Sequence, residues 1–382
     1  MTKLRDICRF QSGGTPSRGT PAYFNGNVPW ITTVALNGDV IDGNQAIEWI
    51  TDEAIAKSAA KIVPPHSVMV GTRVGIGKVA INSVPMSTSQ DIISLIGIDE
   101  NKWDKKFICH LITANKEHLT SQARGATIKG IKIEAIADLV LPEISLKEQA
   151  RISEVIGKVD ALMHMHQQMA MNLEQLIKSR FIELFGDIVL NPFGWEKDYL
   201  GVVCDVRDGT HDSPHYHSTG FPLVTSKNVT GGEIDLTDCS LISEADFNKI
   251  NERSKVNMGD IIMPMIGTVG KPVIVNVEPN FAIKNVSLIK FKDDSRVLNT
   301  FVRSLLQSDY FDDAVLSKVR GGTQKFISLG DIRKLAVIVP PMELQEQFAT
   351  FVEQADKSKL AVQKGLQELE ILKKSLMQQY FG

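Results

Sequence analysis

Apolar residues recur at helical spacing in two long stretches of the chain, one after Pro142 and one after Pro340 and Pro341. The spacing alternates between three and four residues over several heptads, which is typical of a helix with one apolar stripe. A helix of roughly 40 residues spans about 60 Å, too long for one small domain to cover. Pairing of the two helices in a coiled coil explains both length and stripe. Packing of each helix on its own domain is the alternative. The predicted seam residues are Ile152, Val155, Val159, Leu162, Met169, Leu173 and Leu176 in the first helix, and Val352, Ala355, Val362, Leu366, Leu369, Leu372 and Leu376 in the second.

Both helices carry further local signals. Ser145 and Glu148 have the spacing of a capping box, in which the serine caps the first turn and the glutamate reaches back. His166 and Lys359 fall on the two apolar stripes. A lone polar residue at a seam position usually sets the register of a coiled coil, and contact with a partner subunit is the alternative.

The stretches before the helices combine short β-branched runs with glycine turns. VMVGTRVGIGKVAI at 68–81 and DIIMPMIGTVGKPVIV at 260–275 predict strands joined by tight turns. Helical pieces are expected at 103–119 and 298–316. The pattern indicates a mixed α and β composition in each stretch.

The same segments occur twice, in the same order, about 196 residues apart. This order indicates two copies of one domain rather than a solenoid. Helices from two duplicated halves pair most simply in an antiparallel direction, with a pseudo-twofold axis between the halves. The matched segments are VPWITT at 28–33 with FPLVTS at 221–226, GKVAI at 77–81 with GKPVI at 270–274, RGAT at 124–127 with RGGT at 320–323, LPEISLKEQ at 141–149 with VPPMELQEQ at 339–347, and the helix ends LFG at 184–186 with YFG at 380–382.

Composition and charge narrow the class of protein. The chain is 43% hydrophobic, its four cysteines form no CxxC pair, and neither a signal peptide nor a membrane span is evident, so a folded cytoplasmic protein is expected. The net charge is −3, yet residues 61–133 hold ten Lys and Arg against five Asp and Glu, and residues 253–334 hold thirteen against eight. Such local basic regions suit phosphate binding, although an ordinary mixed surface has the same count.

Two glycine- and proline-containing motifs do not support a nucleotide or methyl-donor site. VGIGK at 74–78 has Thr72 where a phosphate-binding loop needs glycine, and Val79 where it needs Ser or Thr. A dinucleotide-binding turn is also excluded, because a strand-like segment follows instead of a helix. NPFGW at 191–195 resembles the motif of amino-methylating enzymes but lacks its second proline.

A histidine-rich loop raises the question of a metal site. THDSPHYH at 210–217 contains three histidines, enough to bind zinc. The matching loop of the first half, GGTPSRGT at 13–20, contains none, so a polar recognition loop is favoured over a duplicated metal site. No catalytic constellation repeats between the halves, which favours a binding protein over an enzyme.

Taken together, these segments resemble the specificity (S) subunit of type I restriction–modification systems over essentially the whole chain. The features that carry the resemblance are GGTPS with VPWITT, DGTH with FPLVTS, the RGAT and RGGT loops, the LKEQ and LQEQ helix starts, NPFGW, and the LFG and YFG helix ends. One departure is Gln324 where the first copy has Ile128.

The resemblance implies an α+β fold with two pseudo-twofold-related target-recognition domains, joined by two long helices in an antiparallel coiled coil. The expected divisions are recognition domains at 1–144 and 187–341, and helices at 145–186 and 342–382. Each domain is expected to read one half of a split double-stranded DNA site, and the helices to set the spacer and dock two methyltransferase subunits. Restriction subunits join that complex. S-adenosylmethionine, ATP and Mg²⁺ are expected on these partners, with no cofactor, metal or catalytic residue in this chain.

The repeated loops supply the candidate DNA contacts. Lys and Arg are expected on phosphates, polar side chains at base edges, and Gly where the backbone approaches DNA. An ordinary turn position is the alternative for each. The candidates are Thr15, Ser17, Arg73, Lys78, Arg124, Gly125, Thr127 and Lys129 in the first domain, and Thr210, His211, Lys227, Lys271, Arg320, Gly321, Gly322, Thr323, Gln324 and Lys325 in the second.

Two other classes of function remain as alternatives. A self-contained DNA methyltransferase or nuclease needs cofactor or metal motifs, which the sequence does not show. A coiled-coil scaffold without a DNA role fits the helices, but it leaves the polar repeated loops in net-positive segments unexplained.

Overall fold

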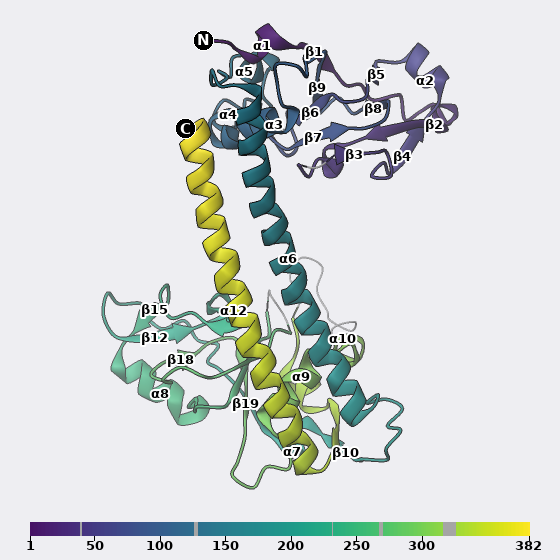
Figure 1. The fold of residues 1–382 in the computed structure, drawn as a ribbon. Coiled ribbons are helices and arrows are strands. Elements are labelled where there is room, and N and C mark those ends of the chain that lie inside the picture. The colour runs from purple at the N-terminus through teal and green to yellow at the C-terminus, as the bar shows by residue number, and fades with distance from the viewer. Residues whose placement is uncertain (39, 126–128, 231, 267–269, 316–325) are drawn as a thin grey trace. The chain divides into compact units, whose positions relative to one another are not determined.

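The computed structural model describes residues 1–382 except 39, 126–128, 231, 267–269 and 316–325. The chain forms two compact units, and each combines a globular part with segments of both long helices. Unit 1 contains residues 1–166 and 364–382, and unit 2 contains residues 167–363 (Figure 1). In the described part of the chain, no helix is long and apolar enough to cross a membrane.

The globular part of unit 1 contains two sheets. A five-stranded sheet has the order β1-β9-β6-β7-β3, and a four-stranded sheet has the order β4-β2-β8-β5. All four residues of β6 and of β7 are buried, which accounts for their unbroken apolar runs. The strands are β1 Arg9–Ser12, β2 Phe24–Ile31, β3 Val40–Ile41, β4 Glu48–Ile50, β5 Ile62–Val63, β6 Val68–Gly71, β7 Val79–Asn82, β8 Met86–Thr88 and β9 Ile92–Ile96. The helices are α1 Leu4–Ile7, α2 Asp52–Lys57, α3 Lys105–Ala114, α4 Lys116–Ser121 and α5 Ile133–Ala137.

Unit 2 repeats this architecture. Its four-stranded sheet, β11-β19-β16-β17, follows the order of β1-β9-β6-β7, and its sheet β15-β12-β18 follows that of β4-β2-β8. The corresponding pair of the second sheet is parallel in both units, β2 with β8 and β12 with β18. The strands are β10 Glu196–Tyr199, β11 Asp205–Asp208, β12 Phe221–Val224, β13 Val229–Thr230, β14 Glu233–Ile234, β15 Ser240–Ile242, β16 Ile261–Pro264, β17 Val273–Ile274, β18 Ala282–Ile283, β19 Val286–Lys290 and β20 Ala336–Val339. The helices are α7 Leu200–Val203, α8 Glu244–Ser254, α9 Asn299–Leu306, α10 Asp309–Ala314 and α11 Leu329–Arg333.

These elements confirm the strands and helical pieces expected from the sequence. The VGIGK segment is a tight turn between β6 and β7, with Gly75 and Gly77 at φ of 70° and 76°. Glycine adopts that left-handed conformation without the steric cost that other residues meet. The helical pieces are each broken once, at Asn115 and at 307–308.

The two long helices have the same length and a constant offset. Helix α6 covers Leu146–Phe185 and helix α12 covers Met342–Phe381, 40 residues each. The Ser145 Oγ accepts a hydrogen bond from the backbone N–H of Glu148 at 3.2 Å, as the capping motif predicts. The Glu148 carboxylate, however, pairs with the Arg151 guanidinium, one turn further along the helix.

A buried glutamine joins the start of each long helix to its globular domain. Gln149 accepts from the N–H of Asp104 at 2.9 Å and donates to the carbonyls of Lys102 and Ile144. Gln345 makes the same three bonds, accepting from the N–H of Leu298 and donating to the carbonyls of Arg296 and Pro340. The predicted match of LPEISLKEQ with VPPMELQEQ at a spacing of 198 is therefore wrong by two residues. Gln149 corresponds to Gln345, 196 residues on.

The long helices pair in an antiparallel direction within each unit, as expected. In unit 1, Arg151 lies against Tyr380 and Asp160 pairs with Lys373. In unit 2, Glu174 pairs with Lys359. Residue numbers thus rise along one helix as they fall along its partner.

Aromatic side chains close the helix ends in both units. The rings of Phe107 and Phe381 lie 4.9 Å apart in unit 1, and those of Phe301 and Phe185 lie 4.9 Å apart in unit 2. Each domain therefore packs on the first turns of one long helix and the last turns of the other.

The seam differs from the prediction in α6. Ile152 and Val159 are buried, and Val155 and Leu173 are half-buried, but Leu162, Met169 and Leu176 are 41%, 50% and 49% exposed. The predicted seam is wrong at these last three positions. Helix α6 has a second apolar stripe, and the hydrophobic pattern alone does not show which stripe meets α12. In α12, Val352, Ala355 and Val362 are buried as predicted, and Leu366, Leu369 and Leu376 are half-buried. Leu372 is 46% exposed, so the predicted seam is wrong there too.

Candidate nucleic-acid interface

Four segments of unit 1 meet at the ends of its central strands. The N–H groups of Gly13 and Gly14 donate to the carbonyls of Ile92 and Thr88. On the other side, the N–H and hydroxyl of Thr72 donate to the carbonyl of Asp91 at 2.8 and 3.1 Å. The N–H of Ile131 then donates to the carbonyl of Thr72. The junction therefore joins the GGTPS loop, residues 88–92, the β6–β7 turn and the loop that contains RGAT.

The packing at this junction explains its glycines and small polar residues. A Cβ on Gly13 would lie 2.1 Å from the Ser89 carbonyl oxygen, so no larger residue fits without moving the backbone. The hydroxyls of Ser87, Thr88 and Ser89 are buried and have no hydrogen-bond partner among the described residues. Buried hydroxyls without a partner are costly in a merely structural position, and such atoms are frequent at binding sites.

The junction presents four of the predicted basic residues. Arg124 pairs through its backbone with Gly130 at the base of the RGAT loop, and a Cβ on Gly130 would lie 2.8 Å from the Arg73 side chain. Arg73 also lies 3.5 Å from the Asp91 carboxylate. Lys78 ends the neighbouring turn and Lys129 follows the tip of the loop; both are exposed. Exposed cations on adjoining turns are a suitable surface for phosphates.

The predicted Thr15 and Ser17 lie in the GGTPS loop, half-buried and exposed respectively. The same loop carries Arg18, which sequence reasoning missed. Its guanidinium forms a two-bonded pair with Glu48 and lies 4.9 Å from the ring of Phe24, over its face. These bonds raise the pKa of Arg18 and lower that of Glu48.

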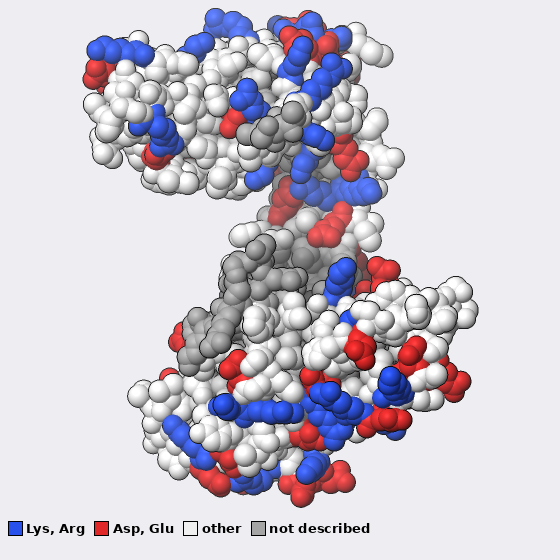
Figure 2. Space-filling view, turned by 180° about the vertical axis from the view of Figure 1, so that it is seen from behind, with Lys and Arg blue, Asp and Glu red and all other residues white. Residues whose placement is uncertain are grey.

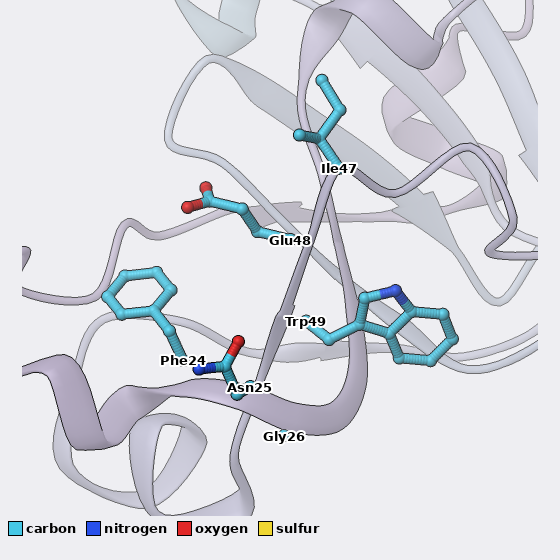
Figure 3. A pocket seen from close by; sticks show the side chains of 6 residues that line it. All are labelled: Phe24, Asn25, Gly26, Ile47, Glu48 and Trp49. Carbon is cyan, nitrogen blue, oxygen red and sulfur yellow. The ribbon is translucent and has the colours of Figure 1, made fainter.

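A shallow pocket adjoins this ion pair in the second sheet of unit 1. Figure 3 shows the side chains of Phe24 and Glu48 on one side of the β4 backbone and the indole of Trp49 on the other. Glu48 is the one titratable group that lines this pocket, and Arg18 already neutralises it. The pocket therefore holds no set of groups for catalysis.

Unit 2 builds the same junction from the second copy of each segment. The N–H groups of Gly209 and Thr210 donate to the carbonyls of Val286 and Ile283, as Gly13 and Gly14 donate to Ile92 and Thr88. His211 therefore corresponds to Thr15. The N–H of Ile327 donates to the carbonyl of Met265 at 2.9 Å, so the residues after the RGGT segment meet the end of β16.

His211 is held on both sides of its ring. Its Nε2 lies 2.9 Å from the Asp208 carboxylate, and its Nδ1 lies 2.9 Å from the Asn285 side-chain oxygen. Hydrogen bonds to Asn285 and Asp208 raise the pKa of His211. Asn285 itself adopts φ of 56°, and its N–H donates to the Thr210 carbonyl.

The other predicted residues of the second domain fall in two groups. Lys227 and Lys271 are exposed, and Lys271 occupies the place of Lys78 after the β16–β17 turn. The remaining predicted contacts lie outside the described residues: Thr127 in the first domain, and Arg320, Gly321, Gly322, Thr323, Gln324 and Lys325 in the second. Gly125 lies within the described part, with φ of 139°.

The surface charge is mixed rather than uniformly basic. Figure 2 shows Lys and Arg in small groups interleaved with Asp and Glu on the face in view. This interleaving agrees with the net charge of −3 and makes local loops, rather than a broad positive face, the candidates for DNA contact.

Several residues at the second junction escaped sequence reasoning because their partners are distant in the sequence. Asp208 and Arg253 form an ion pair across 45 residues, and Lys284 donates to the Ser213 hydroxyl across 71. Sequence periodicity and motif spacing do not predict contacts between residues this far apart in the chain. The repeat itself was the one available signal. Because Gly13 lies next to residues 88–92, its counterpart Gly209 should lie next to the second copy of that segment, which contains residues 284–285.

Comparison with known proteins agrees with this duplicated architecture. The family model described as the type I restriction modification DNA specificity domain matches twice, at residues 1–175 and 192–371. The type I restriction enzyme MjaIX specificity subunit of Methanocaldococcus jannaschii is 25% identical over 401 residues, which cover 99% of this chain and 91% of the relative. The EcoR124I/EcoR124II specificity subunit of Escherichia coli is 30% identical over 166 residues, 42% of this chain and 40% of the relative.

Solved structures show the same fold. The crystal structure of a type I restriction–modification S subunit from M. genitalium superposes with a TM-score of 0.59 at 16% identity, and covers 100% of this chain and 95% of that one. A second structure, from work on complex assembly and conformational transition of the type I system, gives a TM-score of 0.57 at 18% identity, over 100% and 96% of the two chains.

The two copies of the domain, each matched by the DNA specificity model, and the paired long helices define a DNA specificity protein. The chain belongs to the type I restriction–modification DNA specificity family, as the sequence indicated. It is a specificity subunit, in which the α+β domain occurs twice and the long helices join the copies.

Proposed function

We propose that each globular domain reads one half of a bipartite DNA site. The observation that carries this proposal is the junction itself, built twice in one chain from equivalent loops and the same backbone hydrogen bonds. Residues 1–144 and 187–341 are the recognition domains of this proposal, and residues 145–186 and 342–382 are the helices between them. Because the copies differ in side chains, a single chain reads two different half-sites.

The exposed basic residues of each junction contact phosphates, and polar residues contact base edges. Phosphate contacts fix the position of a protein on DNA without reading sequence, whereas side chains at base edges discriminate between bases. The phosphate contacts are Arg73, Lys78, Arg124 and Lys129 in the first domain and Lys227, Lys271, Arg320 and Lys325 in the second. The base or backbone contacts are Thr15, Ser17, Gly125 and Thr127, and Thr210, Gly321, Gly322, Thr323 and Gln324, with His211 beside them as a residue that positions its neighbours.

The long helices set the spacer and bind the methyltransferase subunits. Support comes from the second apolar stripe of α6, in which Leu162, Met165, Met169 and Leu176 are exposed at heptad-like spacing. An apolar stripe that its own chain leaves uncovered marks a docking surface. Two methyltransferase subunits on the helices, joined by restriction subunits, bring the S-adenosylmethionine, ATP and Mg²⁺ that this chain lacks the motifs to bind. The DNA target places the complex in the cytoplasm.

Methylation mapping tests the proposal directly. A cell that expresses this chain with its methyltransferase subunits should show a methylated motif made of two short sequences around an unread spacer. An Arg124→Ala and Arg73→Ala variant should weaken binding to one half-site, and the loss should shrink as salt rises because phosphate contacts release counterions. A single continuous motif, or no motif that depends on this chain, would contradict the proposal.

A further inference from the structure

Arg253 is held at the second junction by a buried carboxylate. Its Nη2 contacts the Asp208 Oδ1, whose side chain is 9% exposed at the end of β11. The Arg253 side chain itself is 68% exposed and lies at the end of helix α8. In the described part of the chain, Asp208 is the only hydrogen-bond partner of this guanidinium. The guanidinium has five N–H groups, and Asp208 accepts from one of the two on Nη2. The second Nη2 N–H therefore remains with the parallel N–H of Nη1 or Nε as a pair of donors in one plane.

His211 fixes the other oxygen of Asp208 and leaves no donor of its own. Both ring nitrogens are occupied, one by Asp208 and the other by Asn285. Beside the loop that starts at Gly209, Arg253 at the end of α8, rather than His211, is therefore the group with free N–H donors. Asp208 and His211 act on it as positioning residues.

We propose that Arg253 reads a guanine in the half-site of the second domain. This inference rests on the proposed function. A planar guanidinium with two parallel donors matches O6 and N7 of guanine in the major groove, the commonest specific contact between an amino acid and a base. Restraint by Asp208 lowers the conformational entropy lost on contact. The carboxylate also balances the charge of Arg253, which weakens attraction to phosphate but leaves the donor directions unchanged.

The repeat gives this network to the second domain alone. The 196-residue offset places Ser12 where the second copy has Asp208. Helix α2 ends at Lys57, after six residues, whereas α8 continues for eleven and carries Arg253 in its last turn. A side chain that differs between otherwise equivalent junctions is suited to reading a base that differs between half-sites.

Atom-by-atom changes in the DNA test the contact. The chain is assembled with its methyltransferase subunits, and binding is measured on its mapped site with each guanine replaced in turn by 7-deazaguanine, which lacks the N7 acceptor. One guanine should be sensitive, with a loss of about tenfold for the wild type. Arg253→Ala should lose a similar factor on unmodified DNA and show no further loss at that guanine.

Matched variants separate this role from others. Arg253→Lys keeps the charge and the pair with Asp208 but not the planar fork, so it should keep the melting temperature and the salt dependence while showing a smaller response to 7-deazaguanine than the wild type. Lys249→Ala, which removes an exposed charge from the same helix, should keep that response. His211→Ala should reduce the ratio of affinities for unmodified DNA and for DNA with 7-deazaguanine at the responding position, because Arg253 is then less well positioned.

Three outcomes overturn the inference and leave the proposed function in place. They are a half-site without a responding guanine, independent losses from Arg253→Ala and 7-deazaguanine, and an equal loss for Arg253→Ala on every sequence, which indicates a phosphate contact. Failure of the proposed function has a different signature, because the wild type then binds no bipartite site.

Discussion

At the scale of single residues, buried polar side chains connect each globular domain to the start of its long helix. Gln149 and Gln345 are 1% and 0% exposed, and each satisfies one N–H and two carbonyl groups. A buried amide with these bonds fixes direction as well as position, because it ties a helix start to a neighbouring turn. The same arrangement in both copies shows that each domain holds its helix in the same way.

Replacement of the buried Gln149 amide by an apolar side chain should destabilise the folded state. The free energy lost with its hydrogen bonds exceeds the free energy gained from new apolar contacts. Gln149→Leu leaves three backbone groups without a partner, and each such group costs about 1–3 kcal/mol when buried. The melting temperature of unit 1 should fall by several degrees in a calorimetric scan. Gln167→Leu, an exposed position of the same helix, serves as the control and should melt with the wild type. Equal melting of both variants would contradict a structural role for Gln149.

The histidine network should be visible in a pH titration. Because hydrogen bonds to Asn285 and Asp208 raise the pKa of His211, its ring should titrate above the ordinary value of 6.5 in an NMR titration. The interaction stabilises the folded state fully below the unfolded pKa, and the contribution is lost as pH rises through the raised folded pKa. Asn285→Ala should lower the pKa of His211. A titration at or below 6.5 in the wild type would contradict the hydrogen bonds described.

At the scale of elements, α6 serves two surfaces. Its inner stripe, with Ile152, Ile156 and Val159, packs within unit 1, while its outer stripe stays exposed.

The polar residues on the inner stripes contact the opposite helix. His166 Nε2 would lie 2.8 Å from a Cβ on Gly365, and Lys359 pairs with Glu174. These contacts favour the role of His166 and Lys359 in setting the register of the helix pair.

Substitutions on the two stripes should separate docking from stability. Leu162, Met169 and Leu176 changed together to Gln should leave the melting temperature within a degree or two, because exposed substitutions change stability little. Binding of the methyltransferase subunits should weaken at least tenfold by calorimetric titration. Ile156→Ala, on the buried stripe, should instead lower stability by about 2–5 kcal/mol. Unchanged subunit binding by the triple variant would exclude the outer stripe as the docking surface.

At the scale of the whole molecule, duplication explains why each unit contains one globular domain and segments of both long helices. Unit 1 ends with the last turns of the C-terminal helix, and its helix pair has the same design as the pair in unit 2. One chain thereby carries two readers with related supports and different side chains. Under the proposed function, this arrangement lets one chain read an asymmetric DNA site without a second kind of subunit.

Shortening both helices should shorten the spacer and leave the half-sites unchanged. Deletion of one heptad from α6 at 163–169 and of its paired heptad from α12 at 362–368 removes about 10 Å of helix. The spacer should lose about three base pairs, since each adds 3.4 Å. Methylation mapping of the variant provides the measurement. Altered half-site sequences with the original spacer would contradict the role of the helices as a ruler.

The sequence by itself determined the duplication, the strands on either side of the VGIGK turn, the two long helices and their antiparallel pairing. These features depend on local periodicity and on matches between two parts of one chain, and both are printed in the residue order. Even so, the sequence match placed Gln149 opposite Gln347, two residues from its true counterpart Gln345. Residue similarity favoured that match, whereas the equivalent hydrogen bonds of Gln149 and Gln345 are visible only in the structure.

Only the tertiary structure decided which apolar stripe of α6 is inner and which side chains complete each junction. Leu162 and Ile156 are equally apolar, and only contact with the opposite helix distinguishes them. Likewise, Asp208, Arg253 and Asn285 are far apart in sequence, and only the folding of β11, α8 and the start of β19 brings them together. Residue order specifies the elements, but long-range packing decides which faces and charges meet.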